Sequence, residues 1–345
     1  MSLRIRRANL DTDRLALIEL IHEQLTPKSD AARFKWLYRD GPFGEALAWV
    51  ACDEATAEIV GAAAAFPRRV YFESEARIGL VLGDFCMKER FRSLGPSLQL
   101  QRACVSAIQV PPFEFFYDFP SLGMMAIYKR LGFTQTGSFV RWAKPLRLES
   151  KLEPLLRSRR LARGVGLVAN AALARRGWRG SRDSCEIEPH QGLCGEEFTV
   201  LDSRLRSQPG TRTVRTAQYL NWRYLTNSDS THDILAARRG GHLIGYVVCT
   251  KSPEDAAVVD LCSVANESDV IARLLGAAVE KYRVSGAATV SLNAGDAHPW
   301  QGLFERAGFR RRETSPLFAG GRSKDSNSGN YFQQNWEVMR GDRDS

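Results

Sequence analysis

Short apolar runs alternate with amphipathic stretches through the first 147 residues. Between the first two apolar runs, Asp11 or Thr12 can cap a helix that runs to about Leu25. Because proline suits the first position of a helix, a second helix is predicted to begin at Pro96, and a short third helix ends at Gly132. The apolar runs predict β-strands at residues 3–7, 46–52, 58–66, 77–87, 113–117 and 140–144.

The second half of the chain repeats this order of elements. Gly240 and Gly241 separate two apolar runs and predict a tight hairpin turn. Residues 335–339 are predicted to close the sheet, and residues 315–330, rich in Gly, Ser and Asn, to form a mobile loop. The strands are predicted at 185–188, 233–237, 242–250, 256–263 and 288–292, with helices at 196–206 and around 271–282.

Four short motifs recur in the two halves in the same order. The first-half and second-half members are Trp36 and Trp222, Gly61 and Gly245, Asp84 and Asp260, and Gly132 and Gly308. The last two motifs are 48 positions apart in both halves, and the first two are 25 and 23 positions apart. This repeat predicts two copies of one folding unit, at residues 1–147 and 184–345, joined by a linker at 148–183.

Most of the net positive charge lies in this linker. The 345-residue chain has a formal net charge of +9, and residues 151–182 hold nine Lys and Arg against one Glu. Two interpretations are open: a solvated helix packed between the domains, or a basic amphipathic segment in peripheral contact with an anionic membrane surface. The nearly neutral remainder argues against a nucleic-acid partner.

Cysteine and histidine usage argues against disulfide bonds and against a metal centre. The seven cysteines are scattered and form no C-x-x-C motif, which is typical of thiols in a reducing compartment. The five histidines form no H-E-x-x-H or similar pair, so no metal is expected. The N-terminus lacks the apolar core of a signal peptide, and no apolar stretch is long enough to span a bilayer. We therefore expect a cytoplasmic protein, located at the inner membrane surface if residues 151–182 bind lipid.

Residues 83–103 combine a strand, a short turn and a helix. Backbone N–H groups in such a turn, together with the helix N-terminus, form an anion site. Gly95 lets the backbone approach a phosphate closely, and Arg92 adds a positive charge. These features suit a pyrophosphate, whereas the simpler interpretation is a glycine that ends a β–α turn.

This stretch resembles motif A of the GNAT acetyltransferase superfamily, in which a loop Q/R-x-x-G-x-G/A follows a strand. The matching residues are Arg92, Ser93, Leu94, Gly95, Pro96 and Ser97. The resemblance implies an α/β (α+β) fold with a mixed, mainly antiparallel sheet and helices on both faces. It also implies that the loop binds acetyl-CoA as a cosubstrate and that the backbone of Met87 pairs with pantetheine. The sequence departs from the motif at Ser97, where Gly or Ala is usual, and at Pro96, which has no N–H to donate.

Residues 125–133 resemble the A-x-x-x-Y-x-x-x-G-F helix and strand of the same superfamily. The resemblance implies that Tyr128 protonates the departing CoA thiolate. A carboxylate must take a proton from the attacking amine, and Asp84 is the best candidate, with Asp118 and Glu89 as alternatives. The competing interpretations are a packing role for Tyr128 and a sheet-edge or helix-capping role for Asp84.

The second half lacks the features of this loop. Alignment on the two aspartates places Ser268, Ile271 and Arg273 at the matching loop positions and Phe304 at the position of the tyrosine. The bulk of isoleucine would obstruct a phosphate, and phenylalanine has no proton to donate. We expect only the first half to bind CoA, while the second half walls the acceptor cleft and stabilises the first.

The expected function is an acetyl-CoA-dependent N-acyltransferase that acts on a small-molecule amine. Similarity to tandem proteins of bacterial cell-surface polysaccharide assembly makes an amino sugar one candidate acceptor. A non-catalytic tandem module that binds a ligand or partner through the same cleft is the alternative. Peptide-bond formation from aminoacyl-tRNA is a third, since related tandem folds do this, but the nearly neutral halves argue against an RNA-binding face.

Overall fold

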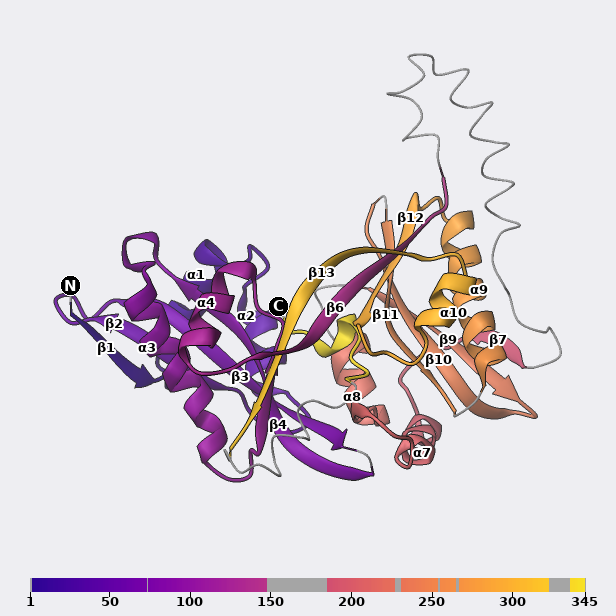
Figure 1. Ribbon diagram of the computed structural model, residues 1–345, viewed down its shortest axis with the longest axis horizontal. Coiled ribbons are helices and arrows are strands. Elements are labelled where there is room, and N and C mark those ends of the chain that lie inside the picture. Colours follow the sequence, from indigo (N-terminus) through magenta and orange to yellow (C-terminus); the bar gives the residue numbers. More distant parts are fainter. Residues whose placement is uncertain are drawn as a thin grey trace, which may run out of the picture.

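A computed structural model describes residues 2–72, 74–147, 185–226, 231–253, 255–264, 267–322 and 336–344. Over these residues the chain forms one sheet of thirteen strands, with helices on both faces (Figure 1). All but two of the strand pairs described are antiparallel. The predicted class, an α/β (α+β) fold with a mixed, mainly antiparallel sheet, is confirmed.

The first half forms one side of the sheet. Its strands are β1 (Leu3–Arg7), β2 (Leu47–Asp53), β3 (Ile59–Phe72), β4 (Glu75–Met87) and β5 (Phe115–Asp118). Its helices are α1 (Arg14–Gln24), α2 (Ala31–Phe34), α3 (Leu94–Val105) and α4 (Leu122–Arg130). Alternate residues of a strand point to opposite faces. Accordingly, Ala64 packs in the core that contains α1, whereas Ala63 packs in the core that contains α3.

Three elements of this half differ from the predicted ones. α3 begins at Leu94, two residues before Pro96. The N-cap position of α1 is occupied by Asp13, and not by Asp11 or Thr12 as predicted. β3 continues six residues beyond the predicted end, to Phe72, because its last part pairs with β8 (Thr211–Thr213) of the second half. The extension also pairs with β4 along its whole length, so β3 has a partner on each side at its end.

The second half repeats the order of elements. Its strands are β7 (Glu186–Pro189), β9 (His232–Arg239), β10 (His242–Lys251), β11 (Asp255–Ser263) and β12 (Thr289–Gly295). Its helices are α7 (Glu196–Leu205), α8 (Ala217–Leu220), α9 (Ser268–Val284) and α10 (Gln301–Arg306). Gly240 and Gly241 form the predicted turn between β9 and β10, with φ of 55° and 79°, where other residues would be strained.

The two halves exchange their closing strands. β6 (Gln135–Pro145) of the first half pairs with β12 of the second half. β13 (Arg310–Gly321) of the second half pairs with β5 of the first half. β6 and β13 also pair with each other and lie side by side at the centre of the molecule (Figure 1). The sheet therefore runs without a break from β1 to β7.

Two predictions for the end of the chain are wrong. Residues 315–321, predicted as part of a mobile loop, belong to β13, because their apolar side chains are buried between the halves. In the described part of the predicted closing strand, residues 336–339, Trp336 and Met339 make only isolated bridges and no strand forms. The rest of the predicted loop, from residue 323, and the basic linker at 148–183 lie outside the described residues.

Equivalent helices of the two halves meet at the centre. α2 and α8 each continue into a π-helix, at Lys35–Arg39 and Asn221–Leu225. These segments carry Trp36 and Trp222, whose rings stack with centroids 5.4 Å apart. Nε1 of Trp36 donates to the carbonyl of Trp222 at 2.8 Å, and Nε1 of Trp222 donates to the carbonyl of Trp36 at 2.9 Å. Trp222 is buried in the central core, Trp36 packs against this core, and the two tryptophans join the halves to each other.

The last described residues return between the two halves. Asp342 forms an ion pair with Arg215 at 3.0 Å. Asp344 pairs with Arg68 of β3 and, at 2.9 Å, with Arg223 of the second half. All five side chains are buried. Because the loss of one partner would leave an uncompensated buried charge, this network fixes the C-terminal segment against both halves.

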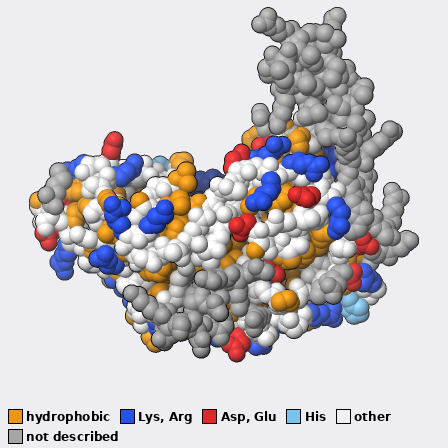
Figure 2. All heavy atoms as spheres, in the orientation of Figure 1, with side chains coloured by type: hydrophobic (Ala, Val, Ile, Leu, Met, Phe, Trp, Pro, Cys, Tyr) orange, Lys and Arg blue, Asp and Glu red, His pale blue; other side chains and the backbone are white. Residues whose placement is uncertain are grey.

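The outer surface carries mixed charge. On the face drawn in Figure 2, the Lys and Arg side chains of the described residues lie among acidic and apolar ones over both halves. No helix in the described part of the chain is both long and apolar enough to cross a membrane.

Trp36→Ala should destabilise both halves together. It removes the ring stacking and one of the two hydrogen bonds that join the halves, with an expected loss of about 3 kcal/mol in the free energy of unfolding. Because one sheet runs through both halves, tryptophan fluorescence and far-UV circular dichroism should follow the same urea transition, shifted to lower urea.

Leu15→Ala is the control, because Leu15 is 78% exposed on α1, and it should change stability by less than about 0.5 kcal/mol. Two separate transitions, only one of them shifted by Trp36→Ala, would show that the halves fold independently.

Candidate functional site

β4 and β5 part shortly after they pair. Their parallel register joins Val81 to Tyr117 and goes no further. Beyond this point the register between β4 and β3 shifts next to Asp84, and β5 ends at Asp118. A cavity of about 860 Å³ opens between residues 82–85 of β4 and the end of β5.

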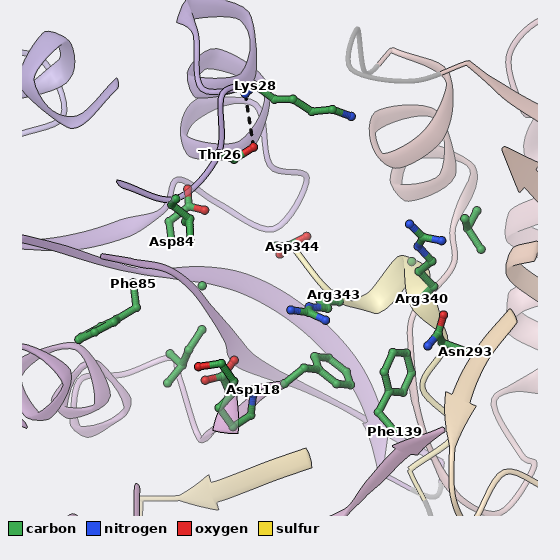
Figure 3. A pocket seen from close by; sticks show the side chains of 18 of the residues that line it. Thr26, Lys28, Asp84, Phe85, Asp118, Phe139, Asn293, Arg340, Arg343 and Asp344 are labelled. Carbon is green, nitrogen blue, oxygen red and sulfur yellow. Dashed lines mark hydrogen bonds between the residues drawn. The ribbon is translucent and has the colours of Figure 1, made fainter. Parts of the chain in front are cut away.

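Both halves and the C-terminal segment line this cavity (Figure 3). The first half contributes Leu82, Gly83, Asp84, Phe85, Gln101, Asp118 and Phe119, among others. The second half contributes Tyr224, His232, Thr250, Val259 and Asn293, and the C-terminal segment contributes Arg340, Gly341, Arg343 and Asp344. The second half therefore forms a wall of the cavity.

Asp84, the candidate base, borders the cavity and forms a buried ion pair with Arg33. Its carboxylate accepts hydrogen bonds from the guanidinium of Arg33 at 2.7 and 2.8 Å, and from the hydroxyl of Tyr38 at 2.9 Å. Its φ of 46° is uncommon outside glycine. Burial and the Asp84 charge raise the pKa of Tyr38 well above its ordinary value, so this hydroxyl stays protonated. Because the guanidinium of Arg33 and the hydroxyl of Tyr38 already engage both carboxylate oxygens, the place of Asp84 favours a structural role.

Asp118, an alternative base, faces the cavity from the end of β5 (Figure 3). Its carboxylate accepts a hydrogen bond from the hydroxyl of Tyr128 at 2.5 Å, and this hydroxyl accepts one from Nε2 of Gln101 at 2.8 Å. Desolvation by the surrounding protein raises the pKa of Asp118 to about 6, although the Tyr128 hydrogen bond and the charge of Arg343 lower it. A carboxylate with this pKa can accept a proton near neutral pH.

Tyr128, the candidate acid, lies on α4 behind the cavity wall. Its ring is fully buried and stacks on Phe116 of β5 and on Phe318 of β13, with centroids 6.2 and 4.9 Å away. Burial and the charge of Asp118 raise the pKa of Tyr128 well above its ordinary value, so it remains protonated. Among the described residues, the tyrosine contacts Asp118 through a hydrogen bond and makes none to Asp84.

The loop that resembles a phosphate site follows β4 directly. Met87, the last residue of β4, is buried, and its sulfur accepts a hydrogen bond from the hydroxyl of Ser97 at 3.4 Å. The guanidinium of Arg92 donates to the side chain of Gln24 at 3.2 Å and to the carbonyl of Met87 at 3.3 Å. The positive charge of Arg92 is therefore held over the end of β4.

α3 presents two backbone donors at its N-terminus. The helix begins at Leu94, after Ser93, whose side chain does not cap it. The N–H groups of Leu94 and Gly95 have no acceptor within the helix, and Pro96 has no N–H. A Cβ placed on Gly95 would meet no atom within 4 Å, so the packing of the protein does not require glycine here. The open space at this helix start suits an anionic group.

The matching helix start in the second half is closed by the protein itself. α9 begins at Ser268, and Ile271 in its first turn is buried. Arg273 donates a hydrogen bond to the carbonyl of Cys185. Phe304, at the position that matches the first-half tyrosine, is fully buried. These side chains serve packing within the second half.

Sequence reasoning missed residues that reach the cavity from distant segments. Arg33 comes from α2, Gln101 from the middle of α3, and Arg340 and Arg343 from the C-terminal segment. No local pattern marks these residues, because only the return of the chain between the halves brings them together. Glu89, the third candidate base, is exposed and is not among the described residues that line the cavity.

Within the described ranges, no group of three or more His, Cys, Asp or Glu side chains is arranged to hold a metal ion. All seven cysteines are buried thiols.

The arrangement of this chain is similar to that of solved acyltransferase structures. A GCN5-related N-acetyltransferase of Anabaena variabilis is 12% identical, with a TM-score of 0.67 over 92% of this chain and 72% of that chain. One of Kribbella flavida is 16% identical, with a TM-score of 0.62 over 92% and 70%. The N-myristoyltransferase of Saccharomyces cerevisiae with bound myristoyl-CoA is 10% identical, with a TM-score of 0.56 over 94% and 84%.

These similarities show that the chain has the GNAT superfamily fold, so the resemblance is confirmed at the level of the fold. No protein-family model matches the sequence, and no curated protein matches it.

Asp118 should make stability depend on pH. Folding raises its pKa from 3.8 to about 6, so the folded protein retains a proton that the unfolded chain releases. This stabilisation is fully present below about pH 4 and is lost as the pH rises through about 6, by up to about 3 kcal/mol. In urea unfolding between about pH 4 and pH 7.5, the wild type should therefore lose stability relative to Asp118→Asn. A difference that stays constant over this range would contradict the raised pKa.

Proposed function

We propose that the protein is an acyl-CoA-dependent N-acyltransferase, with acetyl-CoA as the acyl donor and a small-molecule amine as the acceptor. The observation that carries the proposal is the parting of β4 and β5 around a cavity, with the N-terminus of α3 following the same strand β4. The N-terminus of α3, which could bind an anion, and the carboxylate of Asp118, which could carry a proton, thus lie on either side of the place where β4 and β5 part. The similarity of the fold to N-acetyltransferases supports this assignment.

The first half offers groups that suit coenzyme A. The N–H groups of Leu94 and Gly95 and the guanidinium of Arg92 would hold the pyrophosphate. Ser93 precedes these donors, and the backbone of Met87 would pair with the pantetheine arm. From there β4 leads to the cavity, where the thioester would meet the acceptor.

The reaction transfers the acyl group from sulfur to nitrogen. The neutral amine attacks the thioester carbonyl carbon, the C–N bond forms, and the C–S bond breaks. The nitrogen loses one proton and the thiolate gains one, so the balance needs no further reactant. We assign the proton transfer to Asp118, because this carboxylate faces the cavity and its pKa of about 6 lets it accept and return a proton near neutral pH.

Two other residues would position this carboxylate. Tyr128 donates a hydrogen bond to Asp118, and Gln101 donates to Tyr128, so the two side chains fix the orientation of the base. The sequence-based hypothesis makes Tyr128 the acid that protonates the thiolate. Because Asp118 borders the cavity and Tyr128 does not, we infer that the proton reaches sulfur by way of Asp118. Amino sugars of cell-surface polysaccharide assembly are among the amines to be tested.

Gly95→Glu should abolish acetyl-CoA binding without loss of stability. The new carboxylate would occupy the open space at the start of α3 and repel the pyrophosphate, while its Cβ would meet no atom of the fold within 4 Å. We expect affinity at least about 100-fold lower by calorimetric titration, which corresponds to about 2.8 kcal/mol.

Gly302→Glu is a matched control. Gly302 is also the second residue of an exposed helix start, in α10 of the second half, and its Cβ would also meet no atom within 4 Å. Acetyl-CoA binding should be unchanged in this variant. If the wild type does not bind acetyl-CoA, the non-catalytic module becomes the better hypothesis.

Tyr128→Phe should slow transfer while leaving acetyl-CoA affinity unchanged. In the wild type, the hydrogen bond from Tyr128 lowers the pKa of Asp118. The phenylalanine variant lacks this bond, so the pKa of Asp118 should be higher than in the wild type. We expect kcat to fall by about 10-fold or more, and the acidic limb of the pH–rate profile to move to higher pH. A reduced kcat with an unmoved limb would mean that Tyr128 does not act through Asp118.

A further inference from the structure

Three arginines without a role in the proposed reaction line the cavity: Arg141 of β6, and Arg340 and Arg343 of the C-terminal segment. Figure 3 shows Arg340 at the end of the cavity that lies away from Asp84. Arg141 lies opposite Asn293 in the register of β6 with β12, so the two side chains share a face of the sheet. In the view of Figure 3, Arg340 lies beside Asn293, and Arg343 extends toward Asp118.

Two other arginines of the cavity already have structural partners. Arg33 is neutralised by Asp84 through two hydrogen bonds. Arg223 pairs with Asp344 at 2.9 Å and donates to the carbonyl of Gly341 at 2.8 Å. Because their guanidinium groups are engaged in these contacts, Arg33 and Arg223 have structural roles.

Arg340 differs from both. Its side chain is exposed and makes no ion pair or hydrogen bond with another described residue. Arg141 has an acidic partner, Glu313, at 3.1 Å, but that carboxylate is 73% exposed and the pair is weakened by solvent. Although Arg340 is exposed, nearby protein atoms partly desolvate its guanidinium, and this desolvation together with the charges of Arg343 and Arg141 lowers the pKa of Arg340. Cations crowded in a concave site repel each other until an anion binds among them.

We propose that the acceptor amine carries an anionic group, a carboxylate or a phosphate, which binds Arg340 at this end of the cavity while the amine reaches Asp118. The inference rests on the proposed function and adds the class of acceptor. A guanidinium presents its donors in a plane that matches either oxyanion. With about 860 Å³, the cavity has the size of a small-molecule site.

Three amines that share a two-carbon spacer test this selectivity: ethanolamine, O-phosphoethanolamine and β-alanine, in which the group opposite the amine is neutral, a phosphate or a carboxylate. Each is titrated by calorimetry into the wild type, both free and saturated with CoA so that the phosphate loop is occupied. We expect at least one of the anionic amines to bind about 10-fold or more tightly than ethanolamine. Whichever of O-phosphoethanolamine and β-alanine binds more tightly shows whether the site selects a phosphate or a carboxylate.

Arg340→Gln should remove this preference, and Arg340→Lys should retain part of it because the charge remains. Arg204→Gln is the matched control, because it makes the same change of charge at an exposed residue of α7 that does not line the cavity. The control should bind all three amines like the wild type.

Three results would overturn the proposal: equal binding of the three amines, no binding of either anionic amine, or the same preference in Arg340→Gln as in Arg204→Gln. None of these would affect acetyl-CoA binding or the transfer to a neutral amine, which test the proposed function. The opposite outcome is also distinguishable. If the wild type does not bind CoA but the free protein shows the Arg340-dependent preference, the anion site is supported and the acyl-transfer function is contradicted.

Discussion

The closing strand of each half completes the sheet of the other half, and the cavity depends on this exchange. β6 is paired with β12 on one side and with β13 on the other, so the two halves share one hydrogen-bond ladder. The same exchange brings Phe318 of β13 onto the ring of Tyr128 and sets Arg141 of β6 opposite Asn293. The exchange of β6 and β13 thus both holds the halves together and shapes the site.

Buried charge fixes the remaining wall. Asp342 and Asp344 pair with arginines of both halves, and such pairs contribute little net stability because each ion must be desolvated. Their geometry is demanding, however, and a buried carboxylate without its partner would be costly. The network therefore determines where the C-terminal segment lies, and with it the positions of Arg340 and Arg343 in the cavity.

Local signals in the sequence predicted much of the fold and part of the candidate site. The Gly240 turn and the strand–loop–helix around Gly95 are encoded by neighbouring residues, and both form as expected. The extent of β13 could not be predicted, because it is stabilised by pairing such as that of Phe318 with Asp118, 200 positions earlier. Likewise, Asp84 and Asp118 look alike in sequence as single carboxylates that follow apolar strand residues. They differ because distant side chains surround them, an arginine in one case and a tyrosine in the other.

The two halves repeat one order of elements but present different surfaces at the matching helix start. In the first half, the space before α3 is open at Gly95, whereas in the second half Arg273 bonds to the backbone at Cys185. Both halves form walls of one opening. Tyr128 orients Asp118, and the ring of Tyr128 stacks on Phe318 of β13. The arginines of the C-terminal segment are held between the halves, and the charge of Arg343 lowers the pKa of Asp118. A change at the cationic end would therefore also act on this carboxylate.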